Sequence, residues 1–380
     1  MTPRYGSRLA SVVLLLVSAV LALGAAELTL RWLARPEVRG PLGWKTSLEW
    51  SEGTNELGFR AKRPARRKPG ERILLLGDSQ IEGYHVNLGD TFGAKLQQYL
   101  RHRDWPVEVL ALGAGGWGTD QQLIALRLYV EELDPDQVLV FYTHQNDIWN
   151  TLFPTHMGTP KPTFRLADGQ LVPPDVFLWR PPRPEPTARP LHGILPALRR
   201  LLRGGYASDL DWETTLPARV AAPQAGPDLP LLADVYEEAF GLALWDGEDM
   251  ESERSHFAYL KNPPTPRLLY ALELQQALIA EMKRECDARG IPLRFFNPRL
   301  MTQLWEGEFA HAGRAYSLSF RAAAARLRGV FSAADVPLLE IDDLTREHTW
   351  LPKDAHLNPA GNRFVAKRVG DWLLAQREAR

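Results

Sequence analysis

The stretch 73-ILLLGDS-79 decides the fold: four successive apolar residues run directly into a glycine, an aspartate and a serine. A short apolar run that ends in a turn signal is typical of a strand buried on both faces, the kind found in parallel sheets. The same pattern recurs along the chain, at residues 107–112, 137–142, 293–296 and 336–341. The sequence therefore predicts five buried strands.

Helix-like stretches lie between and after these strands, with apolar residues spaced as on one face of a helix, at residues 91–101, 120–133, 267–289, 317–334 and 359–376. Strands that alternate with helices form βαβ units with right-handed crossovers and mainly parallel strands. We therefore predict an α/β fold, a three-layer α/β/α flavodoxin-like sandwich with a mainly parallel five-stranded sheet. Catalytic groups gather at the carboxyl ends of the strands in such sheets.

The composition excludes several classes of protein. The chain carries 45 Lys and Arg against 46 Asp and Glu, a net charge of -1, so we expect no nucleic acid held by bulk positive charge. The single cysteine, Cys286, excludes an intramolecular disulfide framework and a cysteine-rich metal cluster. The histidines lack the spacing of a zinc-binding helix, and we expect neither a metal nor a cofactor.

The N-terminal segment differs from the rest of the chain because residues 9–26 carry no charge. As a helix they would extend roughly 27 Å, close to the hydrocarbon thickness of a bilayer. A cleaved signal peptide and an uncleaved anchor both fit, but apolar residues continue past Glu27 and favour the anchor. We predict a transmembrane helix over residues 9–33, with residues 1–8 as a cytoplasmic tail and the remaining chain outside the cytoplasm.

The rest of the chain divides into a linker and one large domain. Residues 34–70 are rich in proline and basic side chains and are predicted to be a linker, with one large α/β domain at residues 71–380. Residues 151–262 interrupt the alternation and are again rich in proline. We predict an insertion over the active-site end of the sheet, with helical pieces near 195–202 and 231–244, and a disordered loop is the alternative.

Polar residues cluster after the first three strands. Ser79 follows the first strand directly, where a serine is presented on a tight turn, although serine also caps helices well. The second block, 113-GAGGWGT-119, can point backbone N–H groups at a ligand, and it lacks the lysine of a phosphate-binding loop. Asn146-Asp147 follows the third strand, where an amide can donate to a developing oxyanion, although this pair is also common in turns.

The fourth block, 354-DAHLNPAGN-362, precedes the last helix. An aspartate two residues before a histidine can accept a hydrogen bond from one ring nitrogen while the other nitrogen faces a nucleophile. Together the four blocks supply a nucleophile, backbone donors, a side-chain donor and an Asp/His pair. This is the set of groups needed for acyl transfer through a serine ester.

With these four blocks in order, the sequence resembles the SGNH (GDSL-type) hydrolase family over residues 71–150 and 265–378. The stretch 55-NELGFR-60 and the apolar segment ahead of it resemble the membrane-anchored bacterial branch, which is often associated with extracellular polysaccharides. The resemblance implies a fold and a mechanism that agree with those read from the residues.

The resemblance also implies a role for each site residue. Ser79 would be the nucleophile and an oxyanion donor through its N–H, Gly116 the second backbone donor and Asn146 the side-chain donor. His356 would be the general base and then the general acid, oriented by Asp354. Three further side chains are candidates for supporting these groups: Asp78, Asp147 and Asn358.

The chain departs from the family pattern at three positions. Ala111 stands where the second block commonly opens with asparagine, and His144 stands where glycine commonly precedes the third-block asparagine. Lys353 occupies the position three before the histidine that often carries the aspartate, so Asp354 takes that role here. Two other carboxylates are held in reserve for it: Asp342 and Asp343.

The function expected from the sequence is a serine ester hydrolase, an acyl or acetyl esterase that forms an acyl-serine intermediate. Its partners would be a small acyl ester or an acylated cell-surface or secreted glycan, together with the membrane that holds its N-terminal helix. One alternative is an O-acyltransferase of an extracellular polysaccharide that uses the same Ser79 and His356. The other is a non-catalytic glycan-binding relative.

Overall fold

The computed structural model describes the following residues of the chain: 5–33, 55, 57–62, 64–65, 67–68, 70–152, 155–156, 159–160, 162–174, 258–299, 306–311, 314–350 and 355–379. The helical pieces predicted near 195–202 and 231–244 lie outside the described residues. The chain divides into two compact units, one with the N-terminal helix and the other with the α/β domain.

The N-terminal helix α1 (Tyr5–Leu33) is a single helix of 29 residues. Large apolar side chains between Val12 and Leu23 are exposed. Among the residues whose side chains are described, no helix is both long and apolar enough to cross a membrane. The anchor over residues 9–33 stays a prediction.

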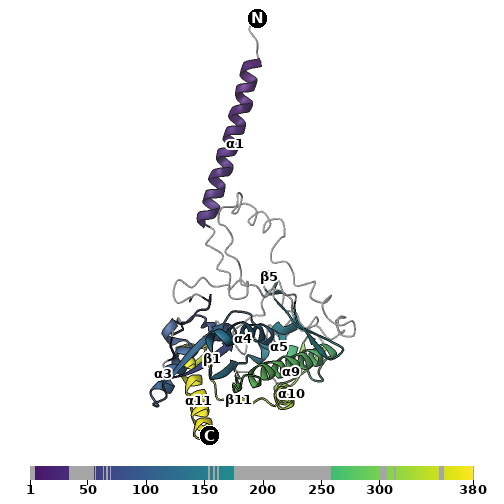
Figure 1. The fold of residues 1–380 in the computed structure, drawn as a ribbon. Coiled ribbons are helices and arrows are strands. Elements are labelled where there is room, and N and C mark those ends of the chain that lie inside the picture. The colour runs from purple at the N-terminus through teal and green to yellow at the C-terminus, as the bar shows by residue number, and fades with distance from the viewer. Residues whose placement is uncertain are drawn as a thin grey trace. The chain divides into compact units, whose positions relative to one another are not determined.

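The domain is built on one sheet whose strand pairs are all parallel. Its strands, in spatial order, are β11 (Leu338–Ile341), β8 (Leu293–Pro298), β3 (Gln137–Phe141), β1 (Glu71–Gly77) and β2 (Val107–Gly113). The predicted five-stranded parallel sheet is confirmed (Figure 1). The last strand begins at Leu338 rather than at residue 336.

Helices cover both faces of this sheet, which explains the continuous apolar runs of its strands. Leu74 and Val140 pack into the core on one face, against α4 (Thr119–Leu133), α9 (Pro266–Asp287) and α10 (Phe320–Ala333). Leu75 and Phe141 pack into the core on the other face, against α3 (Phe92–Arg101) and α11 (Pro359–Glu378). Figure 1 shows α9 beside α10 and α3 beside α11, and these pairs are in contact.

The boundaries of α10 differ from the prediction. The structure extends strand β10 (Arg314–Ser319) over the residues predicted to open this helix, and the helix begins at Phe320. The side chain of Ser319 accepts a hydrogen bond from the N–H of Ala322 and caps the helix. A serine cap fixes a helix start that apolar spacing alone misplaces.

Several short elements complete the described part of the domain. The helical ones are α2 (Ser79–Glu82), α5 (His144–Leu152), η2 (Leu88–Asp90), η5 (Ala258–Leu260) and η7 (Arg346–His348). Antiparallel pairs join β4 (Thr155–His156) to β5 (Thr159–Pro160), β6 (Arg165–Ala167) to β7 (Gln170–Val172) and β9 (Glu306–His311) to β10.

The beginning of the predicted insertion belongs to the domain's packing. Phe164 is buried, and the N–H of Leu166 donates to the Tyr270 hydroxyl of α9 at 3.0 Å. The hairpin of β6 and β7 therefore rests on α9. The bounds of the insertion predicted at 151–262 stay a prediction, and its described first residues pack on the domain.

Residues 57–60, within the predicted linker over residues 34–70, pack on the domain, and the bounds of the linker stay a prediction. The Asn55 side-chain oxygen accepts hydrogen bonds from the N–H groups of Leu57 and Phe59, both at 3.1 Å. The Phe59 ring is only 1% exposed and meets the Trp117 ring edge-on at 5.7 Å between centroids. Phe59 thus packs on the domain from a turn that lacks the periodicity by which strands and helices are recognised in a sequence.

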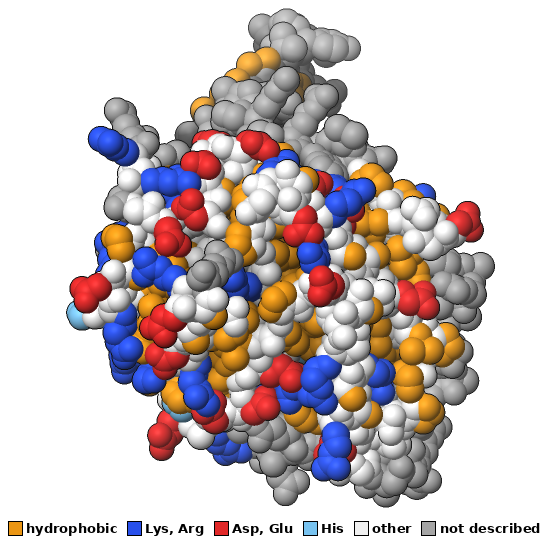
Figure 2. Space-filling model, turned by 60° about the horizontal axis from the view of Figure 1, so that its bottom comes forward, with side chains coloured by type: hydrophobic (Ala, Val, Ile, Leu, Met, Phe, Trp, Pro, Cys, Tyr) orange, Lys and Arg blue, Asp and Glu red, His pale blue; other side chains and the backbone are white. Residues whose placement is uncertain are grey.

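Charges are interspersed over the face of the molecule drawn in Figure 2, where acidic, basic and apolar side chains alternate. This face carries no continuous basic area, in keeping with the net charge of -1.

Candidate active site

The predicted nucleophile lies on a tight turn at the carboxyl end of β1. Asp78 caps α2, and its Oδ1 atom accepts from the Gln80 N–H at 2.9 Å. Gly77 allows this turn, because a Cβ atom there would lie 2.3 Å from Ile81 Cγ1. Ser79 is the first residue of α2, and its carbonyl accepts from the Gly83 N–H at 3.0 Å. The turn thus fixes the Ser79 backbone at the end of the strand.

The structure brings His356 onto this serine. His356 Nε2 lies 2.8 Å from Ser79 Oγ, although 277 residues separate the two in the sequence. When Nε2 carries no proton, it accepts the hydrogen bond of the serine hydroxyl. This distance is that of a nucleophile and its general base.

Hydrogen bonds on both sides hold the loop that carries His356. The Leu357 N–H donates to Gln80 Oε1 at 3.1 Å, which ties the loop to α2. Asn358 caps α11 by accepting from two backbone N–H groups, and its Nδ2 donates to the Thr349 carbonyl at 2.8 Å. Asn358 therefore supports the site by fixing the chain on either side of the histidine.

The carboxylate predicted to orient His356 is Asp354, which lies outside the described residues. The two reserve carboxylates are paired with arginines: Asp342 with Arg299 at 3.1 Å and Asp343 with Arg368. In this structure each of these two carboxylates forms an ion pair with its arginine.

The glycine block follows β2 and lies against α2. Gly116 has a φ of 74°, a left-handed conformation that glycine adopts without strain. The Gly115 N–H donates to Glu82 Oε2 at 2.7 Å. Glu82 is buried, so this carboxylate ties the glycine turn to the helix that carries the nucleophile. Sequence reasoning missed Glu82, and the only local signal was an acidic residue in a short turn next to buried strands.

Asn146 reaches the nucleophile turn from α5. Its Nδ2 donates to Asp78 Oδ2 at 2.7 Å, so the two oxygens of Asp78 hold Gln80 and Asn146 together. An amide nitrogen carries two N–H donors, and the bond to Asp78 engages one of them. Asp78 thus orients the amide that the sequence predicts as an oxyanion donor.

Asp147, next along α5, is fully buried. It accepts hydrogen bonds from the Thr143 N–H at 2.6 Å, from Gln122 Nε2 at 2.9 Å and from Thr119 Oγ1 at 3.2 Å. Burial raises the pKa of its carboxyl well above the usual value, and the nearby charge of Asp78 adds to this. Through these hydrogen bonds Asp147 joins α5 to α4.

His144 explains one departure from the family pattern. Its ring is buried, with Nδ1 2.9 Å from Asn297 Oδ1 and Nε2 3.0 Å from the Tyr259 hydroxyl. Burial lowers the pKa of this imidazole to about 4, so it is neutral at physiological pH. His144 joins the ends of β3 and β8 to the segment at Tyr259, and it is structural.

Arg60 links the docked turn at residues 57–60 to the site. Its guanidinium donates to the carbonyls of Glu82 at 3.1 Å, Gly83 at 2.7 Å and Val86 at 2.6 Å. Arg60 is buried and thus supplies donors to carbonyls where α2 ends. Sequence reasoning missed this role because the partners lie 22 or more residues away.

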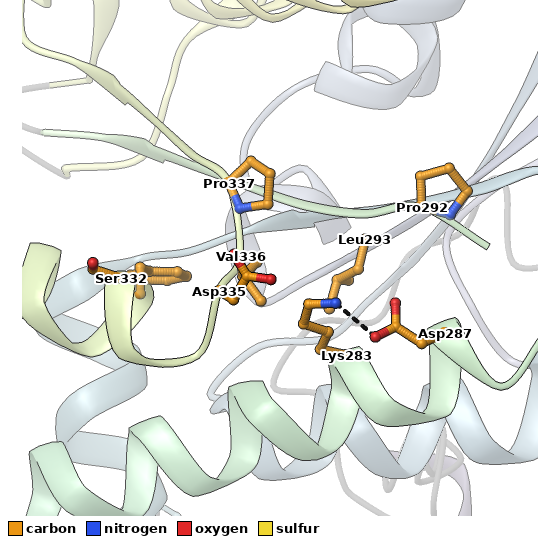
Figure 3. A pocket seen from close by; sticks show the side chains of 9 residues that line it. Lys283, Asp287, Pro292, Leu293, Ser332, Asp335, Val336 and Pro337 are labelled. Carbon is orange, nitrogen blue, oxygen red and sulfur yellow. Dashed lines mark hydrogen bonds and ion pairs between the residues drawn. The ribbon is translucent and has the colours of Figure 1, made fainter. Parts of the chain in front are cut away.

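A surface hollow lies elsewhere in the domain. Figure 3 shows it between α9 and the segments that enter β8 and β11, with Pro292 and Pro337 on its rim and a Lys283–Asp287 ion pair of 2.6 Å inside. These segments approach the amino ends of their strands. The hollow is therefore at the edge of the sheet opposite to Ser79, which follows a carboxyl end.

No protein-family model and no curated protein matches the chain. Among solved structures, it is similar to the psychrotrophic esterase EstA from Pseudoalteromonas sp., with 9% identity, 81% of this chain and 99% of that chain covered, and a TM-score of 0.38. It is similar to AlinE4, an SGNH-hydrolase family esterase, with 12% identity, coverage of 71% and 75%, and a TM-score of 0.29.

A third similar structure is a family 3 carbohydrate esterase from Clostridium thermocellum, with 10% identity, coverage of 78% and 92%, and a TM-score of 0.35. These structural neighbours are esterases. At such identities and TM-scores, the activity of this chain has to be argued from its own residues.

Proposed function

We propose that this protein is a serine ester hydrolase of the SGNH type. The observation that carries the proposal is the 2.8 Å contact between His356 Nε2 and Ser79 Oγ at the carboxyl end of a parallel sheet. Asn146 supports it, because this amide is held on the same turn through Asp78. The glycine turn that Glu82 fixes against α2 supports it further.

In the proposed reaction, His356 takes the hydroxyl proton of Ser79 while Oγ attacks the ester carbonyl. The carbonyl oxygen becomes an oxyanion, which the N–H groups of Ser79 and Gly116 and the amide of Asn146 stabilise. The C–O bond to the alcohol then breaks, and the imidazolium gives its proton to the leaving oxygen. One such donor typically contributes roughly 3–4 kcal/mol in the transition state.

Water completes the cycle. His356 takes a proton from the water as its oxygen attacks the acyl-serine carbonyl, and the same oxyanion donors act again. When the bond to Ser79 Oγ breaks, the proton returns from the imidazolium to the serine, and the carboxylic acid leaves. We propose Asp354 as the group that orients the imidazole through its Nδ1 side.

We propose acyl esters with a small acyl group, such as acetyl groups on a cell-surface or secreted glycan, as substrates. The support is the resemblance of residues 55–60 and of the apolar N-terminal segment to the membrane-anchored branch. The chemistry of Ser79 and His356 requires only an ester carbonyl and an alcohol leaving group.

We also propose that residues 9–33 hold the protein at a membrane with the domain outside the cytoplasm. The absence of charge over residues 9–26 and the exposed apolar side chains of α1 support this. After alkaline washing of membranes, we expect the full chain to stay in the pellet and a variant without residues 1–33 to be released. Recovery of the full chain in the wash would refute the anchor.

The esterase proposal is tested by turnover of a small chromogenic acetyl ester. We expect the wild-type chain to release the alcohol and Ser79→Ala to release none beyond the uncatalysed rate. Ser332→Ala is the matched control, since this serine lies in the hollow of Figure 3, and it should keep full activity. If turnover required an added glycan acceptor and gave acylated glycan as the product, the protein would be an acyltransferase and not a hydrolase.

A further inference from the structure

The turn that follows the nucleophile returns across the catalytic imidazole. The Tyr84 ring stacks on the His356 ring, with 4.6 Å between centroids and 16° between planes. The exposed His85 presents a ring edge to the same imidazole at 6.4 Å and 85°. Tyr84 is half-buried, so its ring covers one face of the histidine that contacts Ser79.

Backbone contacts fix the position of Tyr84. Its N–H donates to the Ser79 carbonyl at 3.3 Å, and Arg60 donates to the carbonyls of Gly83, just before Tyr84, and Val86, two residues after it. Gly83 has a φ of 80° and ends α2 in a left-handed conformation. The stack is therefore built on a turn that is held at both ends.

A stacked ring has two consequences for an imidazole that must take and return a proton. It limits rotation of the imidazole about its χ2 bond, which keeps Nε2 aimed at Ser79 Oγ. The negative face of an aromatic ring also attracts a cation, and His356 becomes a cation during each proton transfer of the proposed reaction. Both effects favour the state in which His356 has just accepted the proton of the serine.

We propose that Tyr84 is a positioning residue for catalysis, which orients His356 by stacking and stabilises its imidazolium form. This inference rests on the proposed function, in which His356 is the general base. The aromatic ring of Tyr84 orients and stabilises the imidazole, and the Tyr84 hydroxyl has no part in this. Tyr84 itself touches neither the ester nor the serine hydroxyl in this role.

The groups that face His356 determine in which direction loss of the Tyr84 ring shifts the pH dependence. From α2 it faces the neutral hydroxyl of Ser79, and from the turn it faces Tyr84 and the titratable ring of His85. From η7, packed beside the same loop, His348 stacks on Phe364 instead. Removing the Tyr84 ring takes away a favourable contact with the cation, so the imidazolium form of His356 is stabilised less.

The test is the pH dependence of labelling by a fluorophosphonate probe, measured on the full-length protein. Labelling requires a neutral His356, so its rate rises with pH through the pKa of that group. For Tyr84→Leu we expect the rise to move to lower pH by about half a unit and the plateau rate to fall about two- to fivefold. Tyr84→Phe keeps the ring and should restore both values.

Several outcomes would overturn the proposal. If Tyr84→Leu left both the pH profile and the plateau rate of labelling unchanged, the Tyr84 ring would play no part in the mechanism. If Tyr84→Phe showed the same shifted pH profile and lower plateau rate as Tyr84→Leu, the Tyr84 hydroxyl and not the ring would be responsible. Tyr84→Met, an unbranched residue of similar length, replaces Tyr84→Leu if the latter lowers the melting temperature, and the same shift is expected from it.

A failure of the proposed function would look different. A wild-type chain that took no label at any pH would refute the esterase, whatever happens at Tyr84. In that case the His356 imidazole is titrated directly by NMR, with the signal assigned by His356→Gln. We expect its pKa to be lower in Tyr84→Leu than in wild type and Tyr84→Phe, and equal values in all three would overturn the inference.

Discussion

Two histidines lie at the carboxyl end of the same sheet, and their surroundings differ. His144 is buried, with one ring nitrogen on Asn297 and the other on Tyr259. His356 is half-buried, with Nε2 on the hydroxyl of Ser79 and its face on Tyr84. The first is enclosed by neutral partners that hold it in one state. The second contacts a group that can give it a proton, and this contact makes it the candidate base.

The largest effect should come from removing the second histidine. His356→Ala is expected to lower ester turnover at least about a thousandfold, because the serine loses the group that takes its proton. The melting temperature should change little, since His356 is only half-buried. Steady-state kinetics with the acetyl ester measure turnover, and a thermal melt measures the melting temperature. Turnover within tenfold of wild type would rule out His356 as the base.

His144→Ala should show the opposite pattern. The substitution opens a cavity and removes the hydrogen bonds to the Tyr259 hydroxyl and the Asn297 side chain, at a cost of about 2–4 kcal/mol of unfolding free energy. Turnover per folded molecule should stay close to wild type. Denaturant unfolding gives the first quantity and active-site titration the second. A stable but inactive variant would place His144 in the chemistry.

The next effect concerns the contact between Glu82 and Gly115. Glu82→Ala should lower kcat about tenfold or more, because the glycine turn loses the acceptor that fixes it near the nucleophile. Glu82→Gln keeps an oxygen acceptor for the Gly115 N–H and should recover most of that loss. If both variants lost the same activity, the charge of Glu82 would matter and the hydrogen bond would not explain its role.

The smallest effect is a change in how stability depends on pH. The folded chain keeps a proton on Asp147 above the ordinary pKa of 3.8, where the unfolded chain releases it. The free energy of unfolding therefore falls as the pH rises from that value through the raised pKa, by up to about 1.4 kcal/mol per pH unit.

Asp147→Asn removes this contribution. Gln122 Oε1 is buried without a hydrogen-bond partner, so a flipped Gln122 amide can accept from the new asparagine. Urea unfolding at several pH values should show a flatter profile in the variant than in wild type. Parallel profiles would mean that Asp147 is ionised in the folded chain.

The sequence predicted the sheet and its helices because helices cover both faces of the sheet, so that strands such as β1 and β3 are buried on both sides. Such strands appear as uninterrupted apolar runs, and the stretch at residues 73–76 could be recognised without any knowledge of its neighbours. The start of α10 was placed too early because β10 continues the apolar pattern up to Ser319. Local patterns locate elements well and their boundaries less well.

The site shows a similar division. Ser79 and His356 stand beside strand and helix ends, where the chain itself marks them, and the structure places them 2.8 Å apart. Glu82, Arg60 and Tyr84 carry no such mark. The contacts of Arg60 and Glu82 join residues that are 22 to 33 positions apart in the sequence. The stack of Tyr84 on His356 joins residues that are still farther apart. These contacts exist only once the chain is folded.

Mass spectrometry of the protein after reaction with a fluorophosphonate probe decides whether Ser79 is the nucleophile that His356 activates. We expect a single adduct in the full-length wild-type chain, mapped to the peptide that contains Ser79, and none in His356→Ala. An adduct on another serine, or an unchanged adduct in His356→Ala, would contradict this role.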